Sequence, residues 1–196
     1  KLYNGIYSNL SKAKTVHDDW EKIYLDNIDY NSLDSAAIEL CNKIVDSEKS
    51  NDNGKIIDRF FGALTPNGSV NYIENLTSDL SKRYFIKGRP GTGKSTMMKK
   101  IGDYFLSQGE NIDHIYCSSD SNSLDGIIIN NRKTAVVDGT SPHVIEPKAP
   151  GAVEEYINLG KAWDRNKLKQ HKSEILDIKQ QMSKLYNGCL LYTSDA

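Results

Sequence analysis

A short glycine-rich segment carries the residue types that bind phosphate groups. Residues 88–96 read Gly-Arg-Pro-Gly-Thr-Gly-Lys-Ser-Thr and match the pattern G-x-x-x-x-G-K-[ST]. Glycines let a loop curl so that consecutive backbone N–H groups point at one anion. Lys94 would add a point charge for the β- and γ-phosphates, and the Ser95 hydroxyl would ligate Mg²⁺. The segment therefore predicts a site for a nucleoside triphosphate with magnesium.

We expect ATP and Mg²⁺ to be the cofactors of this site. The candidate binding residues are Gly88, Arg89, Pro90, Gly91, Thr92, Gly93, Lys94, Ser95 and Thr96. Residues 83–87 read as a strand, and residues 94–108 read as an amphipathic helix with Gly109 at its C-terminal cap. A strand, a loop and a helix in this order are the context that the motif requires. The alternative is a degenerate loop that keeps the fold and binds no nucleotide.

Magnesium bound at such a loop usually needs a carboxylate at the end of a neighbouring strand. Asp138 ends the apolar run at residues 134–138, which reads as a buried parallel strand. That strand would bring Asp138 to the same edge of the sheet as Ser95, so these two residues are the candidate metal ligands. Asp120 also follows a strand and is the alternative acid, unless it is a turn residue of the polar run at 118–123.

The loop that follows Asp138 supplies further candidates. Gly139 stands where many ATPases have the glutamate that polarises water, so that glutamate is absent here. Residues 140–147 leave the ligand-facing edge and contain His143 and Glu146, which could orient a water or an acceptor. Their alternative is a packed histidine and a solvated glutamate in a proline-stiffened loop. The candidate catalytic residues are Lys94, Asp138, His143 and Glu146.

Strand and helix patterns alternate along the chain, which is typical of the α/β class, here a parallel sheet flanked by helices. The expected strands are residues 56–63, 83–87, 112–117 and 134–138, and residues 124–129 fit either state. The expected helices are residues 2–28, 33–48, 69–76, 94–108, 153–163 and 165–187.

This pattern predicts a nucleotide-binding core over residues 55–150, between helical arms at 1–50 and 151–188. Lys-Leu-Tyr-Asn-Gly opens the chain and recurs at residues 184–188, which indicates a tandem protein in which the first arm ends a preceding module. Coincidence is the alternative. Since the chain lacks an initiator Met, we expect the natural N-terminus to lie further upstream. Residues 189–196 break the helical pattern and resemble translated adapter sequence, so we treat them as a non-native tail.

Composition excludes several classes of protein. The 196-residue chain has a formal charge of −1 and a pI of about 6.5, which gives no electrostatic basis for bulk nucleic-acid binding. No apolar run approaches the roughly 20 residues of a membrane span. The three cysteines are widely spaced and the four histidines are scattered, which favours a cytoplasmic protein with reduced thiols over a disulfide frame or a zinc site.

Several segments together resemble an uncharacterised bacterial family of tandem P-loop ATPases, within the P-loop containing nucleoside triphosphate hydrolase superfamily. The segments are residues 61–68, 75–77, 88–96, 123–126, 137–147 and 150–153. The narrowest signature is Asp-Gly-Thr-Ser-Pro-His at residues 138–143. The resemblance spans roughly residues 1–188. It implies a P-loop NTPase fold, ATP bound at residues 88–96, Asp138 as the magnesium-side acid and a second P-loop module in the same full-length chain. It implies no substrate.

The predicted function is ATP binding with magnesium-dependent hydrolysis that drives a conformational change. Without an adjacent catalytic glutamate, hydrolysis would be slow or completed in trans by the other module. The alternatives are a small-molecule kinase, which passes the γ-phosphate to an acceptor, and a scaffold in which nucleotide only orders the fold. Phosphate release without an acceptor separates the ATPase from the kinase, and binding without turnover favours the scaffold.

Overall fold

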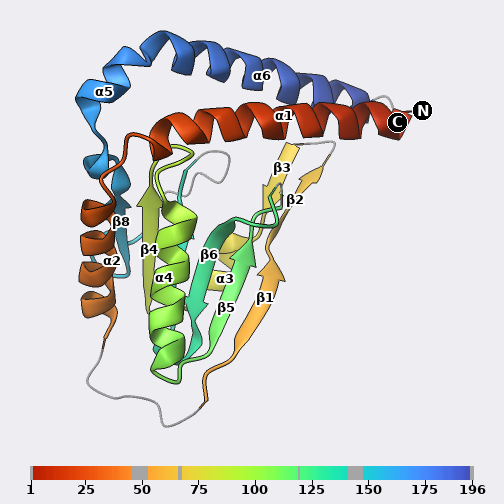
Figure 1. Ribbon diagram of the computed structural model, residues 1–196. Helices are drawn as coiled ribbons and strands as arrows, with labels where there is room; N and C mark the ends of the chain where they lie inside the picture. The colour runs from red at the N-terminus through yellow and green to blue at the C-terminus, as the bar shows by residue number, and fades with distance from the viewer. Residues whose placement is uncertain (1, 46–52, 66–67, 119, 141–147, 195–196) are drawn as a thin grey trace.

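A six-stranded sheet forms the centre of the protein (Figure 1). The computed structural model describes residues 2–45, 53–65, 68–118, 120–140 and 148–194. The sheet has the strand order β1-β5-β6-β7-β4-β8. Its strands are β1 (Ile56–Phe60), β4 (Lys82–Lys87), β5 (Ile112–Tyr116), β6 (Leu124–Ile129), β7 (Thr134–Asp138) and β8 (Glu154–Asn158). β6 pairs antiparallel with both of its neighbours, and the other pairs are parallel.

Helices flank this sheet, which confirms the α/β class. They are α1 (Leu2–Leu25), α2 (Tyr30–Ile44), α3 (Ile73–Thr77), α4 (Lys94–Ser107), α5 (Arg165–Gln170) and α6 (Lys172–Ser194). Two short 3₁₀ helices, η1 (Asn130–Arg132) and η2 (Leu159–Ala162), and the hairpin of β2 (Gly62–Thr65) and β3 (Gly68–Asn71) complete the described elements.

Alternating side chains of the strands build a core on each face of the sheet. Tyr84 and Ile86 of β4 belong to the cluster formed with α2 and α4. Phe85, between them, belongs to the cluster on the opposite face with Ile73 of α3. The two clusters bury β4 on both of its faces, as is usual for a parallel strand.

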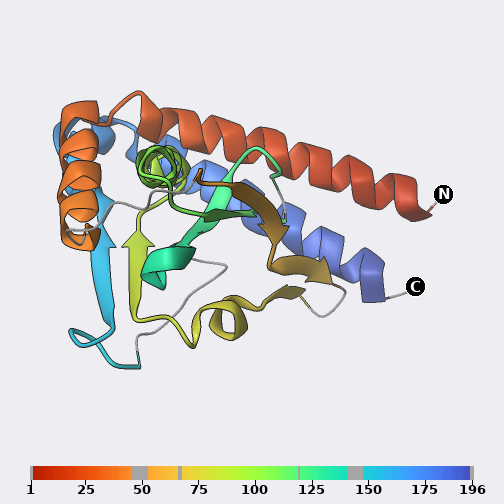
Figure 2. The ribbon, with the colours of Figure 1, turned by 90° about the horizontal axis from the view of Figure 1, so that it is seen from below.

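Helices α1 and α6 form a second feature, a long antiparallel pair (Figures 1 and 2). α1 lies across the end of the sheet to which the carboxyl end of β4 points (Figure 1). The loop between β4 and α4 therefore faces α1. No helix within the described ranges is both long and apolar enough to cross a membrane.

The predicted helix at 153–163 is wrong, because residues 154–158 form the edge strand β8 and only η2 is helical. The buried ion pair between Arg83 of β4 and Glu154 joins β8 to the sheet, and Glu154 also accepts a hydrogen bond from the Ala149 N–H at 2.6 Å. Most of β8 is exposed, so its pattern lacks the apolar run of a central strand. The expected core limit at residue 150 consequently leaves out one strand of the sheet.

The predicted helix at 165–187 is also interrupted. Asp164 caps the start of α5, which ends at Gln170. The next residue, His171, has a ψ of 11°, which lies outside the helical range. α6 then continues in a new direction to Ser194, so its helix includes most of the residues expected to form a tail (Figure 1). No proline or glycine marks this break in the sequence.

Other expected boundaries shift as well. The expected strand at 56–63 divides at Phe61 into β1 and β2, and the expected helix at 69–76 begins as β3. The ambiguous residues 124–129 form the buried strand β6. α2 starts after Asp29, whose side chain accepts from the Asn31 N–H, and its Leu33 lies in the core with α4. Part of the segment expected to be an arm is thus packed on the sheet.

Candidate functional site

The glycine-rich loop, residues 88–93, connects β4 to α4. The strand, loop and helix occur in the predicted order. Gly93 starts α4 in the left-handed region, with φ at 76°, and its carbonyl accepts the N–H of Met97 at 2.8 Å. The helix begins at Lys94, so its positive N-terminal end faces the loop. Gly109, with φ at 84°, follows the other end of α4 as expected.

Neighbouring helices approach the loop closely at two glycines. Gly91 has φ at 74°, and a Cβ there would lie 2.1 Å from the carbonyl oxygen of Glu21 in α1. A Cβ at Gly93 would lie 2.6 Å from Cδ2 of Leu33 in α2. Both positions therefore require glycine for conformation and for space. The loop is held between α1 and α2 rather than open on all sides.

Lys94 folds back over the loop. Its ammonium group donates to the carbonyl oxygens of Gly88 at 2.8 Å and Arg89 at 3.1 Å. It also lies 3.5 Å from Oδ2 of Asp138, and the two side chains are only 12% and 15% exposed. Three acceptors thus hold one largely buried cation at the mouth of the loop.

Asp138 ends β7 and stands opposite Ile86 in the register of β7 with β4. The N–H of Thr140 donates to its Oδ1 at 2.8 Å, and the Thr140 hydroxyl donates to the same oxygen. These two bonds fix the carboxylate, while Oδ2 faces Lys94. The structure therefore brings Asp138 to the glycine-rich loop, as the sequence predicted.

The remaining candidate binding residues differ in their hydrogen-bond partners and in their exposure. The Ser95 hydroxyl accepts the N–H of Leu124 at 2.9 Å, which leaves its second lone pair for another partner. The Thr92 side chain donates to the carbonyl of Arg89 at 2.8 Å and is buried inside the loop. Arg89 and Thr96 are exposed, and Pro90 is half-buried.

The alternative acid, Asp120, occupies a turn and contacts α1 instead of Lys94. Its carboxylate accepts the N–H of Asn122 at 3.0 Å and pairs with Lys14 at 3.0 Å. Burial raises the pKa of Asp120, but the Asn122 hydrogen bond and the Lys14 charge outweigh it and hold the pKa below its usual value. Asp125, the next acid along the chain, is buried in β6. These contacts favour the turn interpretation of Asp120.

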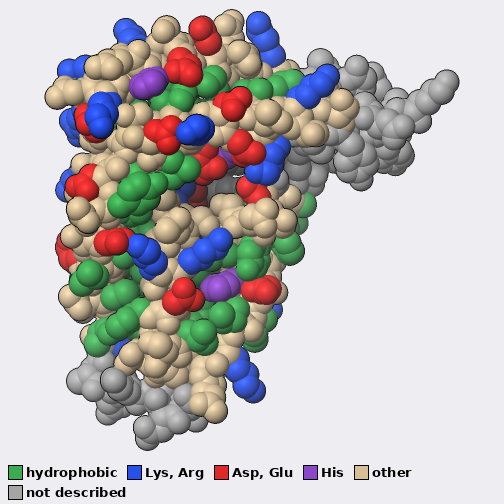
Figure 3. All heavy atoms as spheres, in the orientation of Figure 1, with side chains coloured by type: hydrophobic (Ala, Val, Ile, Leu, Met, Phe, Trp, Pro, Cys, Tyr) green, Lys and Arg blue, Asp and Glu red, His purple; other side chains and the backbone are tan. Residues whose placement is uncertain are grey.

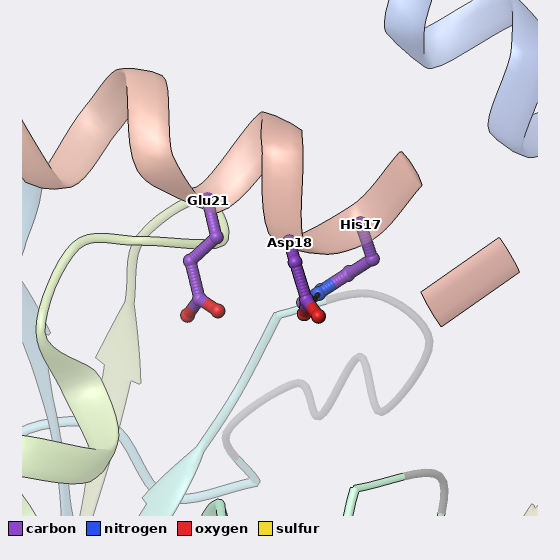
Figure 4. A group of neighbouring side chains, drawn as sticks. All are labelled: His17, Asp18 and Glu21. Carbon is purple, nitrogen blue, oxygen red and sulfur yellow. Dashed lines mark ion pairs between the residues drawn. The ribbon is translucent and has the colours of Figure 1, made fainter. Parts of the chain in front are cut away.

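Helix α1 places a polar face over the loop (Figure 4). The Gly91 N–H donates to Oε1 of Glu21 at 3.2 Å. Asp18 and His17 follow along the same face, and the ligand atoms of these three residues lie within 4.8 Å of one another. Asp18 is half exposed, and such acidic groups are common without a metal, so we assign no metal to them. Acidic and basic side chains gather around a recess below α1 (Figure 3).

Two predicted site residues, His143 and Glu146, lie outside the described residues. One contact was missed by the sequence analysis: Glu21 belongs to a segment that we expected to be only an arm. The helical periodicity of this segment shows which side of the helix is apolar. Nothing in the spacing indicates that the polar side covers the glycine-rich loop.

Comparisons with models of protein families, with curated proteins and with solved structures found no match to this chain. A positive helix end, backbone N–H groups and a buried lysine can hold an anion, and the fixed carboxylate of Asp138 can hold a cation beside it.

Proposed function

We propose that this protein is a P-loop NTPase that binds ATP with Mg²⁺ and hydrolyses it. The observation that carries the proposal is the position of Asp138, on the parallel strand next to β4, with its carboxylate 3.5 Å from the ammonium of Lys94. A glycine-rich loop alone is a weak signal. The same loop with a lysine, a hydroxyl and a neighbouring strand-end carboxylate forms a complete set for phosphates and magnesium.

The residues fit this ligand chemically. The Gly91 N–H already donates to a carboxylate oxygen, so the backbone of the loop can donate to an anionic oxygen. In the proposed complex, the backbone N–H groups of residues 91–96 cradle the phosphates, and the Lys94 ammonium exchanges the carbonyl oxygens of Gly88 and Arg89 for the β- and γ-phosphate oxygens. Ser95 and Asp138 hold Mg²⁺, which neutralises charge on the phosphates. The exposed Arg89 and Thr96 line the rim.

Conformational coupling is part of the proposal. Gly91 contacts both the backbone and the side chain of Glu21, so a change in the loop acts directly on α1. Because α1 packs along α6, a shift of α1 would also move α6. A second P-loop module and a cytoplasmic location remain predictions from the sequence.

The experiment is a measurement of Mg-ATP binding and of phosphate release without an added acceptor. The ATPase proposal predicts binding with release that depends on Mg²⁺. Binding followed by transfer only to an added acceptor would make the protein a kinase. Binding with no turnover under any condition would indicate a scaffold, and no binding would contradict all three functions.

A further inference from the structure

The contact between Glu21 and Gly91 has a consequence for ligand binding at the glycine-rich loop. In a phosphate-binding loop, backbone N–H groups are the donors that receive phosphate oxygens. Here the N–H of Gly91 donates to Oε1 of Glu21 at 3.2 Å. A carboxylate oxygen therefore occupies a place that a phosphate oxygen would take.

The position of α1 makes this contact specific. The backbone of Glu21 lies so close to Gly91 that a Cβ on Gly91 would reach within 2.1 Å of the Glu21 carbonyl oxygen. Further along α1, Lys14 pairs with Asp120 of the loop after β5 at 3.0 Å. Two separate contacts thus fix the polar face of α1 over the carboxyl edge of the sheet, with Glu21 extending beside the loop (Figure 4).

Acidic side chains from neighbouring elements already pair with two groups of the site. Lys94 pairs with Asp138, and the Gly91 N–H pairs with Glu21, so a cation and a backbone donor of the loop are each satisfied by an acidic side chain. A triphosphate that enters would bring several negative charges next to the Glu21 carboxylate. The negative charges of the carboxylate and the phosphates would repel each other in this partly buried site. The carboxylate and the phosphates therefore compete for one position.

We propose that Glu21 is an internal competitor of the nucleotide, whose carboxylate closes the loop until the phosphates displace it. This inference rests on the proposed function and adds its regulation: the arm formed by α1 and α6 sets the affinity of the nucleotide site, and nucleotide binding releases Glu21 from the loop.

The test compares the affinity of Mg-ATP and of inorganic tripolyphosphate for the full chain and three variants. Glu21→Gln removes the charge, and Glu21→Ala removes the acceptor while keeping a good helix former. Asp19→Asn is the matched control, because Asp19 is an exposed acid of the same helix that lines the groove against α6 instead of the loop. We expect both Glu21 variants to bind both ligands about tenfold more tightly than the wild type and Asp19→Asn to bind like the wild type.

Two results would overturn the inference. Equal or weaker affinity in both Glu21 variants would show that the carboxylate does not compete. Unchanged affinity of Glu21→Gln together with lost phosphate release would make Glu21 an acid or base of the reaction instead.

A ligand-free readout separates this inference from the proposed function. The backbone amide resonance of Gly91, measured by NMR without nucleotide, should shift in both Glu21 variants and stay in place in Asp19→Asn. An unchanged Gly91 amide resonance in both Glu21 variants would contradict the contact between Glu21 and Gly91. Absence of nucleotide binding in every variant, with the Gly91 shift present, would instead reject the proposed function and with it the competition, while the contact stands.

Discussion

Lys94 and Asp138 come from different elements and meet at the carboxyl edge of the sheet, where Nζ of Lys94 lies 3.5 Å from Oδ2 of Asp138. Lys94 is the first residue of α4, and Asp138 is the last residue of β7. Their meeting depends on β7 being the parallel neighbour of β4. In the proposed function, phosphates attract Lys94 away from this pair, and the freed Asp138 carboxylate serves the metal side of the site.

Replacement of Asp138 by asparagine should lower turnover while keeping the local hydrogen bond. Asp138→Asn keeps an acceptor for the Thr140 N–H but loses the charge that holds a cation. We expect magnesium-dependent phosphate release to fall by at least about a hundredfold. Asp120→Asn is the control, since Asp120 pairs with Lys14. Equal release by Asp138→Asn and the wild type would remove Asp138 from the site.

Gly91→Ala should be far more disruptive than alanine at another glycine of the same conformation. Gly91 and Gly151 have φ at 74° and 80°, but only Gly91 has neighbours within 4 Å of its added Cβ. Left-handed backbone costs a non-glycine residue about 1–2 kcal/mol, and this cost applies to both variants. The clash with Glu21 should add about 1–3 kcal/mol at Gly91 alone. Urea unfolding checks this, and equal losses in both variants would show that α1 does not lie against the loop.

The ion pair of Arg83 and Glu154 should contribute more to stability than an exposed pair of the same strand. Both side chains are buried, and Glu154→Ala leaves the guanidinium of Arg83 without this partner. We expect a loss of about 3–5 kcal/mol in the free energy of unfolding. Glu155→Ala, which breaks the exposed pair with Lys43, should cost less than about 1 kcal/mol. Similar small losses in both variants would contradict the position of β8 in the sheet.

The pH dependence of stability should include a contribution from Asp120. Its pKa in the folded state is below its usual value, so folding favours the ionised carboxylate. This stabilisation is present above the unfolded-state pKa of about 3.9 and is lost as the pH falls through the lower folded-state pKa. The urea midpoint of Asp120→Asn should therefore fall less steeply below about pH 4 than that of the wild type. Parallel curves for the two proteins would contradict the lowered pKa of Asp120 in the folded state.

The part of the site that the sequence predicted is the part in which neighbouring residues determine the geometry. Residues 88–96 contain their own turn glycines and helix start, and the apolar run before Asp138 identifies a strand that ends at an acid. Because parallel strands end at one edge, the two local patterns placed Asp138 at the same edge as the glycine-rich loop, and the structure adds its contact with Lys94.

The parts that the sequence did not predict depend on distant partners. β8 is a strand because β4 offers it hydrogen bonds and Arg83 offers a counterion for Glu154. Glu21 reaches the loop because α1 crosses the sheet edge, and helical periodicity contains no information about that crossing. Tertiary contacts of this kind override local propensity.

The most direct test of the central claim is Mg-ATP binding, measured by calorimetry, to the full chain and to Lys94→Ala. Lys99→Ala is the matched control, because Lys99 lies on the same helix and donates to the Asn122 carbonyl at 2.9 Å, away from the loop. The proposed function predicts that the wild type and Lys99→Ala bind alike and that Lys94→Ala binds at least about a hundredfold more weakly. Wild-type affinity in Lys94→Ala, or no binding to the wild type, would contradict it.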